Sequence, residues 1–190
     1  MVAGAHGDAV LVEDRGDVMG VDAGDEVIIS PYTFIATYNV CLMHKALPVF
    51  ADTDPTTLTM GPDSIESRIT ERTRAILPVH IYGMPCDMDP INAIARKHKL
   101  AVVEDACQAW LAEYKGNKCG TLGDLGCFSI SSYKVVGGGE GGLLLADDDR
   151  LFAHGSVHEG SATLLMTAYV AREVMEGRLD PLALQRFAEL

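Results

Sequence analysis

Residues 101–142 decide the fold of this chain; they read AVVEDACQAWLAEYKGNKCGTLGDLGCFSISSYKVVGGGEGG. The stretch opens with a short apolar run, residues 101–103, which is typical of a buried strand. Two carboxylates, Glu104 and Asp105, follow the run directly, and Gln108 comes three residues after Asp105. This order predicts a strand with polar side chains at its carboxyl end.

The second half of the stretch carries a hydroxyl, an amine and a flexible loop. Residues 126–130 form another apolar run, which Ser129 interrupts. Lys134 has uncharged neighbours, and a glycine-rich loop, residues 137–142, follows it. This loop is not a dinucleotide-binding fingerprint, because it lacks the strand–GxGxxG–helix order. Together, the carboxylate, the hydroxyl, the lysine and the glycine loop suggest a site for a phosphorylated cofactor.

Outside this stretch, short apolar runs alternate with segments of helical spacing. The runs predict strands at residues 26–30, 48–51, 75–79, 101–104, 127–130 and 142–146. The helical spacing predicts helices at residues 33–45, 63–69 and 87–98. Alternating strands and helices indicate an α/β domain with a mainly parallel sheet flanked by helices. Ligands bind such sheets at the carboxyl ends of the strands, where Asp105 and residues 30–34 and 80–83 are expected to lie.

Composition and charge restrict the classes of function. The chain has 190 residues, 48% of them apolar and 22% charged, which predicts one globular domain with a sizeable core. Its net charge of −12 argues against nucleic acid or an anionic membrane as a partner. No apolar run is long enough to span a bilayer, and no signal peptide is evident, so a cytoplasmic protein is expected.

The five cysteines form no C-x-x-C pair, which favours a reducing compartment. His44 and His80 have no further ligand at metal spacing, so no metal site is expected.

Three parts are predicted along the chain. Residues 1–24 carry recurring glycines and interrupting acids, so this segment is expected to be degenerate and weakly ordered. Residues 25–150 form the α/β domain. Residues 151–190 form a divergent helical tail, with a helix expected at residues 162–175.

Several separate segments resemble one protein family, in the order expected of it. They are GDEVIISPYTFIATYNV (24–40), VFADTDPTTLTMGPDSIE (49–66), PVHIYGMPCDMDPI (78–91), VVEDACQAW (102–110) and GTLGDLGCFSISSYKVVGGGEGG (120–142). They closely resemble the DegT/DnrJ/EryC1/StrS sugar aminotransferases, and the resemblance extends over residues 24–149. It implies the large domain of the aspartate-aminotransferase fold, which is fold type I of the enzymes that use pyridoxal 5'-phosphate (PLP).

The resemblance also implies an activity, a cofactor and partners. Enzymes of this family use PLP to transfer an amino group from glutamate or glutamine to a keto sugar, which is commonly nucleotide-linked. They serve sugar, antibiotic or surface-polysaccharide biosynthesis. They work as homodimers with both sites at the interface, so a homodimer is expected here.

Two residues match the chemical groups of the family's site. Lys134 matches the lysine to which the cofactor is attached, a role that needs an amine able to lose its proton. Asp105 matches the aspartate that pairs with the pyridine nitrogen, so that the ring can accept electrons from the substrate. From the residues alone, Lys134 also fits a solvated surface lysine, and Asp105 also fits a helix N-cap.

Three further residues match cofactor contacts of the family. Gln108 matches a residue near the ring hydroxyl, Phe34 the aromatic residue that stacks on the ring, and Ser129 a phosphate ligand. Without the resemblance, Gln108 fits a surface glutamine and Phe34 a core residue. Ser129 then fits a strand serine that is hydrogen-bonded to the backbone.

The resemblance is incomplete at both ends of the chain. Family members open a helix with Gly-Thr or Gly-Ser to hold the cofactor phosphate, whereas residues 7–9 read Gly-Asp-Ala, and Asp8 would repel a phosphate. Members also continue into a small C-terminal domain, whereas this sequence stops at Leu190. The chain therefore looks truncated, and a degenerate member without turnover, acting as an interaction module or fold remnant, is the alternative function. A dehydratase of the same fold is disfavoured, since those relatives carry His where Lys134 stands.

Overall fold

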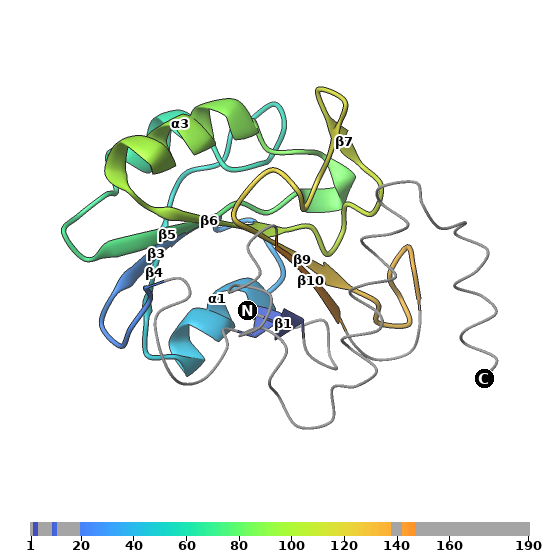
Figure 1. The fold of residues 1–190 in the computed structure, drawn as a ribbon, viewed down its shortest axis with the longest axis horizontal. Coiled ribbons are helices and arrows are strands. Elements are labelled where there is room, and N and C mark those ends of the chain that lie inside the picture. The colour runs from blue at the N-terminus through green and yellow to red at the C-terminus, as the bar shows by residue number, and fades with distance from the viewer. Residues whose placement is uncertain (1, 4–8, 11–19, 138–141, 147–190) are drawn as a thin grey trace.

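A six-stranded sheet forms the centre of the chain, in the order β10–β9–β6–β5–β3–β4 (Figure 1). The structure is a computed structural model that describes residues 2–3, 9–10, 20–137 and 142–146. The strands are β3 (Glu26–Ile29), β4 (Leu47–Phe50), β5 (Thr73–Leu77), β6 (Ala101–Asp105), β9 (Leu125–Ser129) and β10 (Gly142–Ala146). Neighbouring strands pair in parallel from β4 to β9, and only β10 runs antiparallel to its neighbour β9 within this sheet. The predicted α/β fold with a mainly parallel sheet is confirmed.

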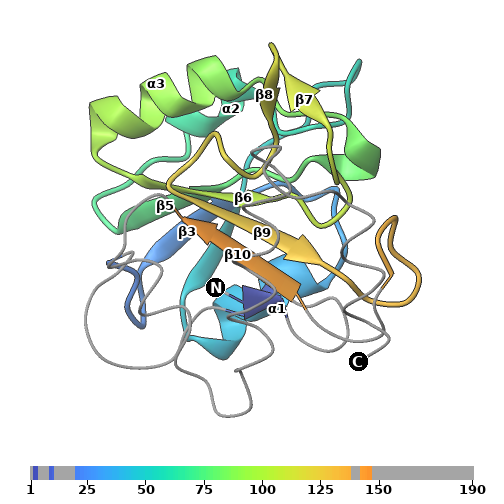
Figure 2. The same ribbon diagram turned by 45° about the vertical axis from the view of Figure 1, so that its right-hand side comes forward.

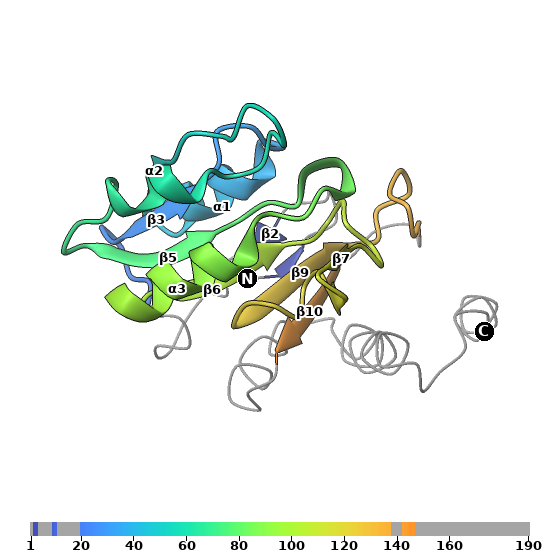
Figure 3. The same cartoon turned by 90° about the horizontal axis from the view of Figure 1, so that it is seen from above.

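Helices cover both faces of the sheet (Figure 2). They are α1 (Ala36–Met43), α2 (Pro62–Glu66), α3 (Met88–His98) and a 3-10 turn, η1 (Ile81–Gly83). Figure 3 shows α2 and α3 on one side of the strands, with α3 lying along β6. The predicted helix at residues 33–45 is shorter in the structure, because residues 31–35 form a loop before α1 begins.

Alternation along the strands builds two apolar cores, one on each face of the sheet. Val27 and Ile29 of β3 pack with Val40 of α1, whereas Ile28 packs with Ile91 of α3. Successive side chains of a strand point to opposite faces, so a continuous apolar run supplies both cores. In α3, the buried positions Met88, Ile91 and Ala95 follow helical spacing.

Two short strand pairs lie outside the main sheet. The hairpin of β7 (Glu113–Tyr114) and β8 (Asn117–Lys118) was not predicted from sequence, because two-residue strands give no readable alternation. Its turn residues, Lys115 and Gly116, both have positive φ, as such tight turns require. Within the segment expected to be weakly ordered, β1 (Val2–Ala3) pairs antiparallel with β2 (Ala9–Val10). The predicted helix at residues 162–175 lies outside the described residues, and the predicted domain boundaries stay predictions.

The Glu104 carboxylate organises the carboxyl end of β6. It is fully buried; its Oε1 accepts hydrogen bonds from the backbone N–H groups of Leu122 and Gly123, each at 2.6 Å. Its Oε2 accepts from the Gly120 N–H at 2.7 Å and from His80 Nε2 at 2.9 Å. One carboxylate thus joins the loop after β5 to the loop before β9.

His80 takes part in this network as a neutral imidazole. Its Nδ1 accepts a hydrogen bond from the Cys86 backbone N–H at 3.0 Å, so Nδ1 carries no proton. The remaining ring proton is therefore on Nε2, which donates it to Glu104. A buried, neutral histidine bonded on both nitrogens is a structural group.

Gly126 of β9 allows the loop containing Gly120 to come close enough for the Gly120 N–H to bond Glu104. A Cβ atom at Gly126 of β9 would lie 2.0 Å from the carbonyl oxygen of Gly120, which is far inside van der Waals contact. Only glycine therefore allows the Gly120 peptide to pack against β9 while its N–H reaches Glu104.

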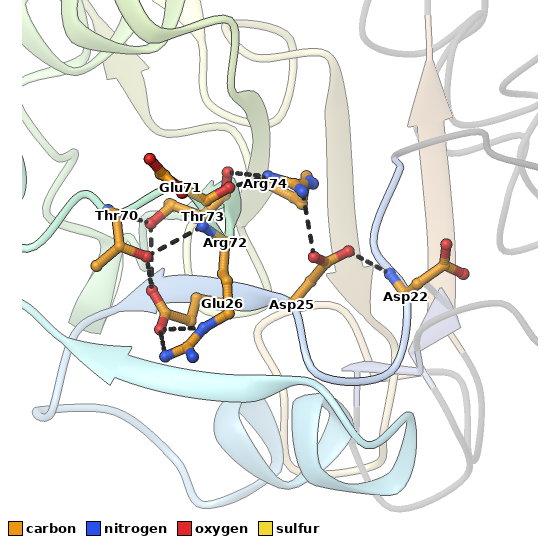
Figure 4. Close-up of polar contacts among 8 residues, drawn as sticks. All are labelled: Asp22, Asp25, Glu26, Thr70, Glu71, Arg72, Thr73 and Arg74. Atoms are coloured by element: carbon orange, nitrogen blue, oxygen red, sulfur yellow. Dashed lines mark hydrogen bonds and ion pairs between the residues drawn. The ribbon is translucent and has the colours of Figure 1, made fainter.

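A second buried carboxylate clamps the opposite, amino-terminal ends of β3 and β5 (Figure 4). Glu26 accepts hydrogen bonds from Arg72 Nε at 3.0 Å and Nη2 at 2.5 Å, and from Thr70 Oγ1 at 2.6 Å. The Thr70 hydroxyl and the Arg72 guanidinium hold the pKa of Glu26 below its ordinary value of 4.5.

None of the helices in the described part of the chain is long and apolar enough to cross a membrane.

Glu104→Gln should destabilise the fold strongly. The new amide places an NH₂ group opposite two backbone or ring N–H donors, so those donors lose their acceptor. Each buried donor left unsatisfied costs about 1–3 kcal/mol, so we expect the free energy of unfolding to fall by about 3 kcal/mol or more. Urea unfolding checks this, with Glu113→Gln as the exposed control, for which a loss of under about 1 kcal/mol is expected. Equal urea midpoints for both variants would contradict the role of Glu104.

Glu26→Gln should weaken the fold in a pH-dependent way. The pKa of Glu26 is lower in the folded chain, so its stabilisation is present above the ordinary glutamate pKa and is lost as the pH falls through the folded-state pKa. We expect a loss of about 1–2 kcal/mol near neutral pH, because the Arg72 partner is largely exposed. At about pH 3 the variant and the wild type should differ much less. Urea unfolding at both pH values measures this, and Glu71→Gln, an exposed neighbour, should show no such pH dependence.

Candidate active site

The predicted site residues gather at one edge of the sheet. Asp105 is the last residue of β6, and Ser129 is the last residue of β9. The loop containing Phe34 follows β3, and η1 follows β5. Because β3, β5, β6 and β9 run parallel, their carboxyl ends meet at the same edge.

Asp105 is a buried carboxylate, only 6% exposed, with both oxygens engaged. Its Oδ2 accepts a hydrogen bond from Thr37 Oγ1 at 2.9 Å, and its Oδ1 accepts from the Cys107 backbone N–H at 3.1 Å. No helix begins after β6 within the described chain, so the helix N-cap interpretation of Asp105 is wrong. No described cation forms an ion pair with it, which leaves its charge available to a cationic ligand.

Lys134 lies beside aromatic rings with its side chain partly buried. Its Nζ is 6.0 Å from the centre of the Phe34 ring and 5.3 Å from that of Tyr133. Its backbone N–H donates to the Ser131 carbonyl at 2.8 Å, which closes a turn directly after β9. No described carboxylate forms an ion pair with the Lys134 amine, so the amine is not neutralised by a partner in this part of the chain.

Phe34 and Gln108 line the same region. Phe34 is 47% exposed, so it is not a core residue, and one part of its ring is accessible to a ligand. Gln108 Oε1 accepts a hydrogen bond from the Tyr82 backbone N–H at 2.9 Å. This bond fixes the amide orientation and leaves its NH₂ as the group that can donate to a ligand.

The hydroxyl of Ser129 pairs with that of Ser131 in a buried position. Only Ser129 was predicted from sequence. Ser129 Oγ lies 3.1 Å from Ser131 Oγ, and both residues are fully buried. The Ser131 backbone N–H also donates to Ser129 Oγ at 3.4 Å, so the backbone-bonded interpretation of this serine holds in part. Ser131 was missed, although its spacing of two residues from Ser129 was the available signal.

Cys107 is bonded to Asp105 through its backbone N–H, but its thiol is not a nucleophile. Burial, and then the Asp105 carboxylate, raise the pKa of its thiol well above the ordinary value of 9.0, while Lys134 lowers it slightly. The thiol therefore stays protonated at neutral pH. Geometry relates the carboxylate to the amine: Thr37 bonds both Asp105 and the Phe34 backbone, and the Lys134 amine lies 6.0 Å from the centre of the Phe34 ring.

Thr37 and a pair of tyrosines were not predicted from sequence. Thr37 bonds Asp105 from α1, across 68 positions of sequence, and no local pattern identifies such a contact. The hydroxyls of Tyr32 and Tyr82 lie 3.3 Å apart at the ends of β3 and β5. Tyr82 has a φ of 52°, a strained conformation for a non-glycine residue.

The donor set matches the chemistry of PLP. The buried anionic Asp105 suits a protonated pyridine nitrogen, the Lys134 amine suits an aldehyde, and the Phe34 ring suits a flat aromatic ring. Ser129 and Ser131 are fully buried and their hydroxyls bond each other, so the phosphate contact expected of Ser129 stays a prediction. No three His, Cys, Asp or Glu side chains of the described ranges are grouped as a metal site would require.

Known proteins with similar sequences include a GDP-perosamine synthase and an aminotransferase. The GDP-perosamine synthase of Caulobacter vibrioides is 47% identical over 135 residues, covering 71% of this chain and 36% of that protein. The L-glutamine:2-deoxy-scyllo-inosose aminotransferase of Streptomyces fradiae is 44% identical over 135 residues, covering 71% of this chain and 32% of that protein. The chain thus spans about a third of the length of these curated relatives.

Solved structures agree with the sequence matches. An aminotransferase from Psychrobacter cryohalolentis superimposes with a TM-score of 0.71 at 34% identity, covering 83% of this chain and 47% of that one. NtdA of Bacillus subtilis, solved with bound cofactor PMP, superimposes with a TM-score of 0.68 at 37% identity, covering 73% of this chain and 31% of that one. The family model for the DegT/DnrJ/EryC1/StrS aminotransferases matches residues 13–160. The sequence, the sheet and the family match agree: this chain belongs to the DegT/DnrJ/EryC1/StrS aminotransferase family.

Proposed function

We propose that the protein is a PLP-dependent aminotransferase that moves an amino group from glutamate or glutamine to a keto sugar, commonly nucleotide-linked. The observation that carries this proposal is the meeting of the buried Asp105 carboxylate, the Lys134 amine and the exposed Phe34 ring at one edge of the sheet. By its name, one relative forms GDP-perosamine, and the other transfers an amino group from L-glutamine to 2-deoxy-scyllo-inosose; both names support a polyhydroxylated keto substrate.

Each residue has a role that its surroundings allow. When bound, PLP supplies an electron sink and the carbonyl carbon through which amino groups are exchanged. Asp105 would hold a proton on the pyridine nitrogen, and Phe34 would support one face of the ring. One hydroxyl proton of the Ser129–Ser131 pair would remain to donate to the phosphate, and Gln108 would donate its NH₂ to the ring hydroxyl.

Lys134 is both the attachment point and the group that moves protons. A free lysine amine accepts a proton only when it is neutral, and the neighbouring rings of Phe34 and Tyr133 provide apolar surroundings. The short turn after β9 places the amine near the strand ends, where Asp105 lies.

The proposal includes a homodimer in the cytoplasm. Apolar side chains next to Lys134 are exposed, with Tyr133 at 68% and Val135 at 80%, and such surfaces favour a partner. The five cysteines are free and buried, which suits a reducing compartment.

PLP should attach to Lys134 and to no other lysine. After incubation with PLP and reduction with borohydride, peptide mass spectrometry should find the adduct on Lys134, because its amine lies beside Phe34 and near Asp105. Lys134→Ala should abolish the adduct and change the free energy of unfolding by less than about 1 kcal/mol, since the amine makes no ion pair with a described residue. Lys118→Ala, which removes a half-buried, ion-paired lysine, should leave the adduct unchanged. Even labelling of all lysines would refute the proposal and favour a member without turnover.

Asp105→Asn should weaken PLP binding more than folding. The variant loses the charge that pairs with the pyridine nitrogen, and charge-assisted bonds of this kind are worth about 1.5–3 kcal/mol. We therefore expect the Kd for PLP to rise about 10- to 100-fold, measured by absorbance titration. Asp63→Asn, at an exposed position of α2, should leave the Kd unchanged. An unchanged Kd in Asp105→Asn would assign Asp105 a purely structural role.

A further inference from the structure

Thr37 connects two of the candidate cofactor contacts at once. It lies in the first turn of α1 and is 1% exposed. Its hydroxyl donates a hydrogen bond to Asp105 Oδ2 at 2.9 Å, and its backbone N–H donates to the Phe34 carbonyl at 3.1 Å. A single buried residue thus contacts both the carboxylate and the aromatic residue of the site.

The direction of the hydroxyl chain follows from proton counting. A threonine hydroxyl has one proton, and an ionised carboxylate only accepts, so the proton of Thr37 is directed to Asp105. The contact of 2.8 Å between Thr33 Oγ1 and Thr37 Oγ1 must then be donated by Thr33. The chain runs from Thr33 through Thr37 to Asp105, and each bond in such a chain polarises the next.

The Asp105 carboxylate is held from both sides. Thr37 bonds its Oδ2, while the Cys107 N–H bonds its Oδ1 at 3.1 Å. Two donors, one on each oxygen, fix the rotation of the carboxylate plane. Each oxygen retains a second lone pair, so the fixed carboxylate still has acceptor capacity for a ligand.

We propose that Thr37 is a positioning residue that, together with Thr33, sets the orientation of Asp105 toward the pyridine nitrogen of PLP. This inference rests on the proposed function. Thr33 precedes Phe34 directly, so the same chain ties the loop that carries the aromatic ring to the carboxylate. Thr37 acts through Asp105 and does not itself contact the cofactor.

Equilibrium binding of PLP to the wild type, Thr37→Val, Thr37→Ser, Thr33→Val and Thr59→Val tests this. Valine keeps the shape of threonine without its hydroxyl, whereas serine keeps the hydroxyl. We expect the Kd for PLP to rise about tenfold in Thr37→Val, about threefold in Thr33→Val, and by less than about twofold in Thr37→Ser. Thr59→Val is the matched control, because Thr59 is also buried and bonded to a threonine hydroxyl, and it should leave the Kd unchanged.

The protonation of the cofactor nitrogen provides a second readout that packing alone does not alter. With ¹⁵N-labelled PLP, the nitrogen signal should be that of a protonated ring in the wild type and Thr37→Ser, and should move toward the unprotonated value in Thr37→Val. Equal affinity and equal ¹⁵N shifts in Thr37→Val and the wild type would overturn the inference while leaving the proposed function standing. Equal losses in Thr37→Val and Thr37→Ser would overturn it too, since packing would then explain both. Failure of the wild type to bind PLP at Lys134 would instead reject the proposed function, and the role of Thr37 with it.

Discussion

The fully buried carboxylate of Glu104 is the constraint on which the rest of the structure depends. Removing a charge from water is costly, and it is tolerated only where hydrogen bonds replace the lost hydration. Glu104 meets this condition with three backbone N–H groups and the neutral His80 ring. These bonds connect the loops on either side of β6, so the strands carrying the site are joined at their carboxyl ends.

The neighbouring residues Glu104 and Asp105 point to opposite faces of the sheet and bond different segments. Successive residues of a strand point in opposite directions. Glu104 turns toward the loop before β9, whereas Asp105 turns toward α1 and meets Thr37. The first carboxylate is saturated by N–H donors; the second has fewer donors and keeps acceptor capacity. The same residue type thus serves as a structural anchor at one position and as a candidate ligand group at the next.

The family match covers the part of the chain that carries the candidate site residues. The chain covers about a third of its curated relatives, and that third contains the strand ends where Asp105, Ser129 and the Lys134 turn lie. The parallel order of β3, β5, β6 and β9 explains why residues from distant segments share one edge. Burial keeps the Cys107 thiol protonated, so this thiol is not a nucleophile of the neighbourhood.

By itself, the sequence determined the α/β class and most strands and helices, because apolar periodicity is a local property. The resemblance of separate motifs to one family singled out Asp105, Gln108, Ser129, Phe34 and Lys134 as candidate site residues. It missed the β7–β8 hairpin, whose strands are too short to show a period. Only the tertiary structure decided that Thr37 bonds Asp105, that Ser131 pairs with Ser129, and that Glu104 is an anchor. The contacts of Thr37 and Glu104 depend on the packing of segments far apart in the chain, and such hydrogen bonds leave no trace in local composition. The Ser129–Ser131 pair joins residues only two apart, and it depends on the backbone conformation at the end of β9.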